Sequence, residues 1–442
     1  MKTVDERRGA AYRWYVVAVL MAVSVLGYID RLVLGFLVDP IKADLALSDT
    51  QMGVLTGVAF ALFYVIMGLP LGRWIDTGRR VGILSLCVAL WSAMTAACGA
   101  AVNFLTLFIG RMGVASGEAA LNPAAVSIIS DLFPRDRSAL PISIFSLGIY
   151  IGGGLALILG GQLIDLFNQM GAVTLPGFDE VSAWRLVFFA VGLPGIVAAV
   201  LLFVTVREPE RRLLGEADQA AAASMAGVFV FLREQRRLYI WLFGGTLTFG
   251  FYLYAVIGWY PAMLMRTYGL EPGDAALGYG LVYLIFGVAG ALSVGPLTGI
   301  LKRRGVDEAA VVLCFSAMLV MALPAALGPL APSAWLCLAC FALTKYCWAL
   351  TITTAFVAIA EVTPNTLRGL MTSVFMAAMN VTGGALGAVI VGVLSDNVFG
   401  PEKIRYALSL NAAVFVPLAA VLFFVARKPY RQRMAALRAQ SA

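Results

Sequence analysis

The sequence of 442 residues contains no histidine. Histidine is the side chain that normally changes charge near neutral pH, so proton chemistry in this chain must use carboxylates. A histidine-based catalytic pair is excluded as well, no cysteine is paired with a base, and no carboxylates have metal-ligand spacing. The sequence therefore predicts no enzyme, no metal site and no cofactor.

Cysteines are absent from the places where they could form disulfides. All six fall inside apolar runs, and no pair lies in a loop between the runs. This pattern gives no indication of a disulfide framework. Cys337 and Cys340 are three residues apart, and on a lipid-embedded helix we interpret them as small packing residues.

Charged residues make up only 13% of the chain, whereas a soluble domain has about 25%. Hydrophobic residues make up 61%, and the mean hydropathy is +0.89. A membrane-spanning helix needs roughly 20 mostly apolar residues. We predict an all-α membrane protein with twelve spanning helices, near residues 14–38, 51–71, 81–101, 104–130, 139–163, 184–206, 238–263, 277–300, 309–328, 334–360, 370–395 and 405–426.

The lysines and arginines predict the orientation of these spans. Most of the 32 lie before the first span, in the breaks after even-numbered spans, or in the tail. By the positive-inside rule both termini are cytoplasmic, and we expect a multi-pass protein of a bacterial inner membrane. The net charge of +7 reflects this topology, so no nucleic-acid partner is predicted. The basic residues outside this pattern are Arg31, Lys42, Arg111, Arg185, Arg266, Lys345, Lys403 and Arg405.

The chain is predicted to consist of two six-helix halves, residues 1–206 and 238–442, joined by a cytoplasmic linker, residues 207–237. Residues 225–237 alternate apolar and basic side chains, and a helix on the inner membrane surface and a plain linker remain equally open. Two repeated six-helix bundles are a transporter architecture, with the substrate site expected between them near the midplane. Functionally similar positions repeat at a constant offset: Arg137 with Arg368, Gly161 with Gly392, and Asp165 with Asp396.

Five charged residues lie well inside predicted spans: Asp30, Arg31, Arg111, Glu118 and Lys345. Each costs roughly 2.5–3.5 kcal/mol at the bilayer centre, so it normally faces a partner or a wet cavity. The two negative charges of Asp30 and Glu118 balance the two positive charges of Arg31 and Arg111. Lys345 adds a positive charge to the second half of the chain. The four could be structural ion pairs between helix 1 and helix 4, but buried pairs often cost more in desolvation than they return.

Neighbouring polar residues extend this set. Arg111 and Glu118 are seven residues apart and therefore share a helix face, and Asn122 continues it. Tyr252, near the outer end of helix 7, is a candidate for lining an amphipathic cavity. Moving helix 1 against helix 4 would change the partner of Glu118 and so its proton affinity.

After helix 2 the chain reads Gly72-Arg73-Trp74-Ile75-Asp76-Thr77-Gly78-Arg79-Arg80. This stretch resembles the cytoplasmic signature of the major facilitator superfamily. The resemblance implies that Gly72, Asp76, Arg79 and Arg80, together with Arg137 after helix 4, latch the inner helix ends in one conformational state. The corresponding loop of the second half lacks the aspartate, so its latch is expected to be weaker or absent.

Helix 1 carries Tyr28-Ile29-Asp30-Arg31, and helix 4 carries Gly110-Arg111 followed by Gly117-Glu118-Ala119. These motifs are similar to those of the spinster-like branch of that superfamily, although Gly27 stands where asparagine is usual. The branch is known for transporting lysolipids and phosphorylated sphingoid bases, generally with proton coupling. The resemblance implies that Arg31, Arg111 and Lys345 face an anionic head group, with Asn122 and Tyr252 nearby.

The predicted function is alternating-access transport, driven by a proton gradient, of an amphipathic anionic lipid-like substrate. Glu118 is the expected main proton site and Asp30 the second. The alternatives are a symporter of a small organic anion or another metabolite, and a drug-type efflux pump. A channel or receptor is disfavoured by the two-half repeat. The expected partners are the bilayer and the substrate, and the expected state is a monomer.

Overall fold

The computed structural model describes residues 4–133, 139–170, 173–175, 178–210, 225–364 and 367–441. Twelve helical segments in these ranges are long and apolar enough to cross a membrane, which confirms the predicted number of spans. The chain forms two compact units, and each is described by itself. Unit 1 comprises Met1–Arg212 and Leu264–Leu284, and unit 2 comprises Leu213–Met263 and Ile285–Ala442.

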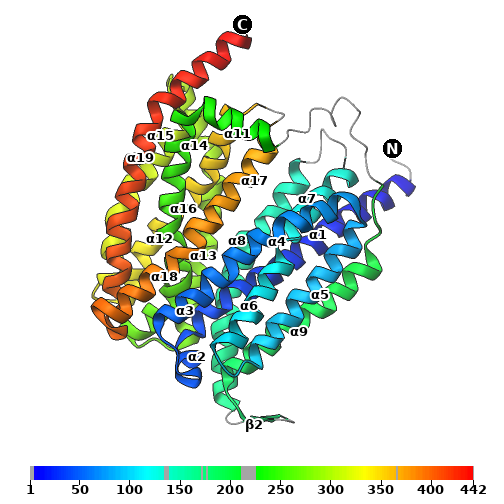
Figure 1. The fold of residues 1–442 in the computed structure, drawn as a ribbon, viewed down its shortest axis with the longest axis vertical. Coiled ribbons are helices and arrows are strands. Elements are labelled where there is room, and N and C mark those ends of the chain that lie inside the picture. Colours follow the sequence, from blue (N-terminus) through cyan, green and yellow to red (C-terminus); the bar gives the residue numbers. More distant parts are fainter. Residues whose placement is uncertain are drawn as a thin grey trace. The chain divides into compact units, whose positions relative to one another are not determined.

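Unit 1 contains the first six spans and a segment from the middle of the chain (Figure 1). That segment holds the end of α12 (Arg236–Tyr268) and most of α13 (Pro272–Leu292). The other helices are α1 (Val4–Leu32), η1 (Val33–Phe36), α2 (Val38–Leu45), α3 (Asp49–Thr56), α4 (Val58–Thr77), α5 (Arg80–Gly99), α6 (Phe104–Glu118), α7 (Leu121–Leu132), α8 (Ala139–Met170) and α9 (Ala183–Thr205).

Unit 2 holds the last four spans, the parts of spans 7 and 8 that lie outside unit 1, and a short helix, α11 (Met225–Glu234). α11 falls on the stretch predicted as an interfacial helix or plain linker. Span 11 is interrupted by two π-helical turns, a feature often found at functional sites. The other elements are α14 (Val294–Arg303), α15 (Ala309–Leu327), η3 (Gly328–Leu330), α16 (Ala334–Val362), α17 (Arg368–Met379), η4 (Asn380–Gly384), α18 (Ala385–Leu394), η5 (Ser395–Phe399), η6 (Pro401–Lys403) and α19 (Ile404–Ser441).

Two short strands are an addition to the predicted helices. β1 (Val173–Leu175) and β2 (Phe178–Val181) form an antiparallel hairpin between α8 and α9. Hydropathy could not indicate them, because the hairpin is only a few residues long and lies outside the apolar runs. The fold class is otherwise confirmed, since the spanning elements are all helices.

Two helices of unit 1, α3 and α6, start at capping boxes. Ser48 accepts a hydrogen bond from the backbone N–H of Gln51 at 3.1 Å, and the Gln51 side chain accepts one from the Ser48 N–H at 2.9 Å. Asn103 caps α6 in the same way through Thr106. Such capping boxes satisfy backbone donors that a helix cannot satisfy itself, so these turns fix where α3 and α6 begin.

Inside unit 1, α5 packs along α9, α1 along α8, and α6 against both α4 and α5 (Figure 1). Their contact faces are buried and apolar, as for Leu20, Leu84 and Val114. The opposite faces expose large apolar side chains, including Leu86 and Val197. An apolar exposed face is expected where a helix contacts lipid, so the two faces agree with membrane insertion.

Unit 2 has ion pairs at the end that the charge pattern places in the cytoplasm. Lys302 on α14 pairs with Glu361 at 2.5 Å, and the Tyr430 hydroxyl also donates to Glu361 at 2.6 Å. Glu308 accepts hydrogen bonds from Arg431 at 3.0 Å and Arg427 at 3.3 Å, both on α19. These ion pairs join the loop after α14 and the tail helix to their neighbours, and the expectation of a weaker or absent latch in the second half stays a prediction.

Candidate functional site

A small cavity, lined by both polar and apolar side chains, lies within unit 1. One face of α1 forms a wall of it with Ser24, Gly27, Tyr28 and Arg31. These positions follow the spacing i, i+3, i+4 and i+7, which places them on one side of a helix. The rest of the lining comes from other helices: Tyr64 of α4, Glu118 of α6, and Leu121 and Asn122 of α7.

Arg31 is the cation of this cavity. Its Nη2 lies 3.5 Å from Oε2 of Glu118, and its side chain is 21% exposed. The guanidinium carbon lies 4.1 Å from the centre of the Phe60 ring, 5.3 Å from that of Tyr64 and 5.6 Å from that of Tyr28. Aromatic faces attract a cation, so these rings support the charge where water is limited.

Glu118 is the last residue of α6, and a break in helix 4 follows it. Pro123 lies just beyond the break; it has no backbone N–H to continue the hydrogen-bond ladder, which favours an interruption here. Gly117 lets α6 approach α5 closely, because a Cβ at this position would lie 2.7 Å from the Cys87 carbonyl oxygen. The glycine and the proline together fix the position of the Glu118 carboxylate.

Arg111 lies behind this wall and is 1% exposed. Its Nη1 donates a hydrogen bond to the backbone carbonyl of Asp30 at 3.3 Å, and its guanidinium lies 5.3 Å from the Phe60 ring centre. Arg111 is absent from the cavity lining, however, so it supports the wall from behind.

Asn122 lines the cavity together with Glu118. Its side-chain amide donates to the Tyr64 hydroxyl at 3.4 Å, a bond that joins α7 to α4. Asp30 lies elsewhere: it is 2% exposed, it is not part of the lining, and its carboxylate faces Trp91 and Thr95 of α5. The four charged residues predicted on helices 1 and 4 therefore lie close together. Arg31 and Glu118 line the cavity, whereas Asp30 and Arg111 are buried outside its lining.

Lys345 and Tyr252 belong to unit 2. Lys345 is 1% exposed, and its ammonium nitrogen lies 3.7 Å from the ring centre of Trp348, one turn along α16. Tyr252 is 2% exposed, and its ring lies 6.1 Å from that of Phe249. Both side chains are thus buried inside unit 2, and their predicted contact with substrate stays a prediction.

Among the predicted latch residues, Arg80 is the one that is buried, and it carries a network of hydrogen bonds. It contacts Asp131, donates to Glu208 at 2.8 Å and to the Pro209 carbonyl at 2.7 Å, and reaches the Ser127 hydroxyl at 3.0 Å. The network ties the start of α5 to the ends of α7 and α9. Sequence reasoning missed Glu208, although its position directly after span 6 is a usable signal.

The other latch residues are less constrained. Asp76 and Arg79 are exposed, and a Cβ at Gly72 would meet nothing within 4 Å. Arg137 lies outside the described residues. The latch role of all five positions stays a prediction, with Arg80 as the residue whose contacts best fit it.

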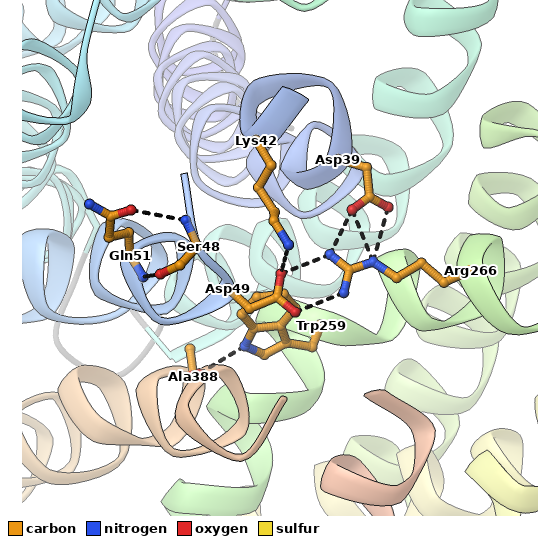
Figure 2. A network of polar contacts seen from close by, with 8 residues as sticks. All are labelled: Asp39, Lys42, Ser48, Asp49, Gln51, Trp259, Arg266 and Ala388. Carbon is orange, nitrogen blue, oxygen red and sulfur yellow. Dashed lines mark hydrogen bonds and ion pairs between the residues drawn. The ribbon is translucent and has the colours of Figure 1, made fainter. Parts of the chain in front are cut away.

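A second ion network lies within unit 1, at the end that the charge pattern places outside (Figure 2). Arg266, near the end of α12, donates to Asp39 at 2.6 Å and 2.9 Å and to Asp49 at 2.9 Å and 3.0 Å. Lys42 also contacts Asp49, which is fully buried. One sequence signal indicates this network: Lys42 and Arg266 are two of the few basic residues outside the cytoplasmic pattern.

Comparisons with known proteins agree with this architecture. Residues 20–381 match the Major Facilitator Superfamily. The chain is 30% identical over 433 residues to an MFS-type efflux pump of Mycolicibacterium smegmatis, covering 97% of this chain and 95% of that protein. It is 28% identical over 298 residues to a probable L-galactonate transporter of Escherichia coli, covering 65% of this chain and 61% of that protein.

A solved structure gives the same picture. It is the crystal structure of a bacterial homologue of the human lysosomal transporter Spinster, in an inward-facing and unoccupied conformation. It matches with a TM-score of 0.80 at 27% identity and covers 96% of this chain and 97% of that chain. The similarity to the spinster-like branch, inferred from the motifs of helices 1 and 4, is confirmed.

Twelve helices that are long and apolar enough to cross a membrane, together with the family match, define a multi-pass integral membrane protein. The chain belongs to the Major Facilitator Superfamily, whose match extends over most of its length. It is therefore a transporter and no enzyme.

Proposed function

We propose that this transporter couples the movement of an anionic substrate to a proton gradient by alternating access. The observation that carries the proposal is the contact between Arg31 and Glu118. Their closest nitrogen and oxygen are 3.5 Å apart, longer than the 2.7–2.9 Å of a strong charge-assisted bond, and both groups line the cavity. An ion pair with a purely structural role would be expected to be tighter and closed to a cavity.

The two residues act as one exchange site. While Glu118 is charged, it holds Arg31, and an anion that binds Arg31 has to displace the carboxylate. A proton on Glu118 releases Arg31, so that the proton and the anion favour each other's binding. Binding of both keeps the cavity neutral, whereas binding of either one alone would leave it charged, and a neutral cavity costs less to close away from water. This logic favours movement of the proton and the anion in the same direction.

The two ion networks of unit 1 serve as latches in this scheme. Arg266 with Asp39 and Asp49 holds the outer end, and Arg80 with Asp131 and Glu208 holds the inner end. Alternating access requires that a contact stabilising one state be broken in the other. We therefore expect the Arg266 network to open when the cavity opens to the outside.

The proposed substrate is an amphipathic anion of the lysophospholipid or sphingoid type. The similarity to a spinster homologue supports this class, and so do the aromatic rings around Arg31, which suit a head group attached to an apolar body. A small organic anion is the second candidate. The polar lining favours it, as does the similarity to a probable L-galactonate transporter.

The deciding experiment is uptake into proteoliposomes with an imposed pH gradient. Fluorescent lysophosphatidylglycerol and radiolabelled L-galactonate are offered to the same preparation, and collapse of the gradient with an uncoupler is the control. Gradient-dependent uptake of the lysolipid supports the first class, and uptake of galactonate the second. Transport that is equally fast without a gradient would overturn proton coupling.

We further propose that the chain is a monomer in a bacterial inner membrane with both termini cytoplasmic. The basic residues that follow even-numbered spans support this orientation. Labelling of single cysteines in intact cells tests it on a background in which the six native cysteines are replaced. A cysteine at exposed Arg79 should resist an impermeant reagent, whereas one at exposed Glu402 should react.

A further inference from the structure

We infer that Phe60 is a positioning residue for Arg31: its ring fixes the guanidinium of Arg31 in the orientation in which that group meets an anion. The inference rests on the proposed anion binding by Arg31 and deepens it. Phe60 is absent from the lining of the cavity, so it acts through Arg31 and touches no substrate there.

The contact between Phe60 and Arg31 fits a stacked guanidinium. The guanidinium carbon of Arg31 lies over the Phe60 ring, 4.1 Å from its centre. Its distances to the ring centres of Tyr64 and Tyr28 are longer, 5.3 Å and 5.6 Å. Stacking leaves the N–H donors of a guanidinium accessible, because they lie at the edge of its plane. One of these donors, Nη2, is 3.5 Å from Oε2 of Glu118, so this edge points toward the cavity lining.

The ring of Phe60 is itself held in place. Tyr64, one turn further along α4, stacks on it with ring centres 5.9 Å apart and planes inclined by 24°. The guanidinium carbon of Arg111 also lies over the ring, 5.3 Å from its centre, and Arg111 is bound to the backbone carbonyl of Asp30. Phe60 is only 5% exposed. The ring is therefore a fixed surface against which the side chain of Arg31 is oriented.

Two positive groups, those of Arg31 and Arg111, share this one ring. Like charges repel each other, and the negative face of an aromatic ring offsets part of that repulsion. Glu118 adds a negative charge while it is ionised. In the proposed cycle a proton on Glu118 removes this charge, and the contact with Phe60 remains. At that step Phe60 keeps the guanidinium in place until an anion binds.

Packing alone would also explain a buried phenylalanine, and Phe60 belongs to the apolar core of unit 1. Packing needs an apolar side chain of the right size, whereas the positioning role needs the negative face of an aromatic ring. The two explanations therefore differ for substitutions that keep the size of the ring and change its charge distribution.

The test places phenylalanines with one, two or three ring fluorine atoms at position 60 of the full-length protein. Fluorine withdraws charge from the ring face with little change in size, so the contact with Arg31 weakens stepwise. KM for gradient-driven uptake of lysophosphatidylglycerol or L-galactonate should rise in the same order. It should reach about tenfold in Phe60→Leu, with kcat changed by no more than about twofold. A KM that stays constant or falls along the series would overturn the inference.

A double-mutant cycle shows whether Phe60 acts through Arg31. In the Arg31→Lys background the planar group is gone, so Phe60→Leu should raise KM no further. Equal effects of Phe60→Leu in both backgrounds would contradict the positioning role. Phe145→Leu is the matched control and should leave KM unchanged, because Phe145 is buried in the same apolar core but lies on α8, outside the cavity lining.

A second measurement needs no transport. In nanodiscs, with isotope-labelled arginine, the side-chain Nε–H resonance that Arg31→Lys removes is assigned to Arg31. Phe60→Leu should move this resonance, because the ring current of Phe60 is lost, and Phe145→Leu should leave it in place. An unmoved resonance in Phe60→Leu would overturn the inference. If neither anion were taken up, the proposed function would fail, and the resonance would still decide the role of Phe60.

Discussion

Asp30 and Arg31 are neighbours in the sequence, but their side chains face different surroundings in unit 1. Arg31 lines the cavity and meets Glu118, whereas Asp30 meets Trp91 and Thr95 on α5. Arg31 is therefore open to the cavity, whereas Asp30 is buried outside its lining. Neighbours in the sequence thus have different access to whatever enters the cavity.

Replacing Glu118 by Gln is expected to abolish gradient-driven uptake. Glutamine keeps the shape of the side chain but cannot bind or release a proton near neutral pH. Exchange of labelled for unlabelled substrate without a gradient should persist, which shows that the protein is folded. The matched control is Glu402→Gln, at an exposed position. Wild-type accumulation by the Glu118 variant would contradict the assignment.

Replacing Arg31 by Lys is expected to raise KM for the anion about tenfold, equivalent to about 1.4 kcal/mol. The charge is kept, but the planar guanidinium 4.1 Å from the Phe60 ring centre is lost. Arg405→Lys is the control, because Arg405 also lies over an aromatic ring, that of Tyr406, and is not among the residues that line the cavity. Equal KM values for the two variants would argue against anion binding by Arg31.

Replacing Arg80 by Ala is expected to destabilise the protein by about 3 kcal/mol, because Asp131 and Glu208 would lose their shared cation in a buried setting. The neighbouring exposed Arg79 provides the control, and Arg79→Ala should change stability little. Thermal unfolding in detergent measures both variants. Similar melting temperatures for the two would mean that the network around Arg80 contributes little.

Replacing Gly117 by Ala should cost about 1–3 kcal/mol, since the new Cβ would lie 2.7 Å from a backbone oxygen of α5. Gly72→Ala is the control, because a Cβ there meets nothing within 4 Å. The same melting experiment compares them. The Gly117 variant should also lose transport, since the approach of α6 to α5 positions Glu118, and full activity would show that this approach can relax.

The ion pairs of Glu308 predict a pH dependence of stability. Burial alone would raise the pKa of Glu308, but the hydrogen bond from Arg431 and that from Arg427 outweigh it, so the pKa lies below the usual value of 4.5. The stabilisation is therefore complete above pH 4.5 and is lost as the pH falls through the lower value of the folded protein. Glu308→Gln should remove this part of the acid destabilisation in thermal unfolding. An unchanged acid profile would contradict it.

Much of the fold could be predicted because lipid imposes long apolar runs that are visible in composition alone. The charges of helices 1 and 4 were also visible, since ionisable residues in such runs are rare. The aromatic partners of Arg31 could not be predicted. Phe60 and Tyr64 look like ordinary residues of an apolar helix until the structure shows which face of α4 is turned toward α1. Arg266 stood out as a basic residue outside the cytoplasmic pattern, but its partner Asp39 could not be predicted, since 227 residues separate the two.

The last helix has a practical consequence. α19 runs for 38 residues, about 57 Å, nearly twice the roughly 30 Å of the hydrocarbon layer. Its final turns are braced by Glu308 and by Asp307, which pairs with Arg438 at 2.7 Å. A small domain fused to this helix in continuous register would be held rigidly, and could serve as a fiducial mark for electron cryo-microscopy of a protein with little mass outside the membrane.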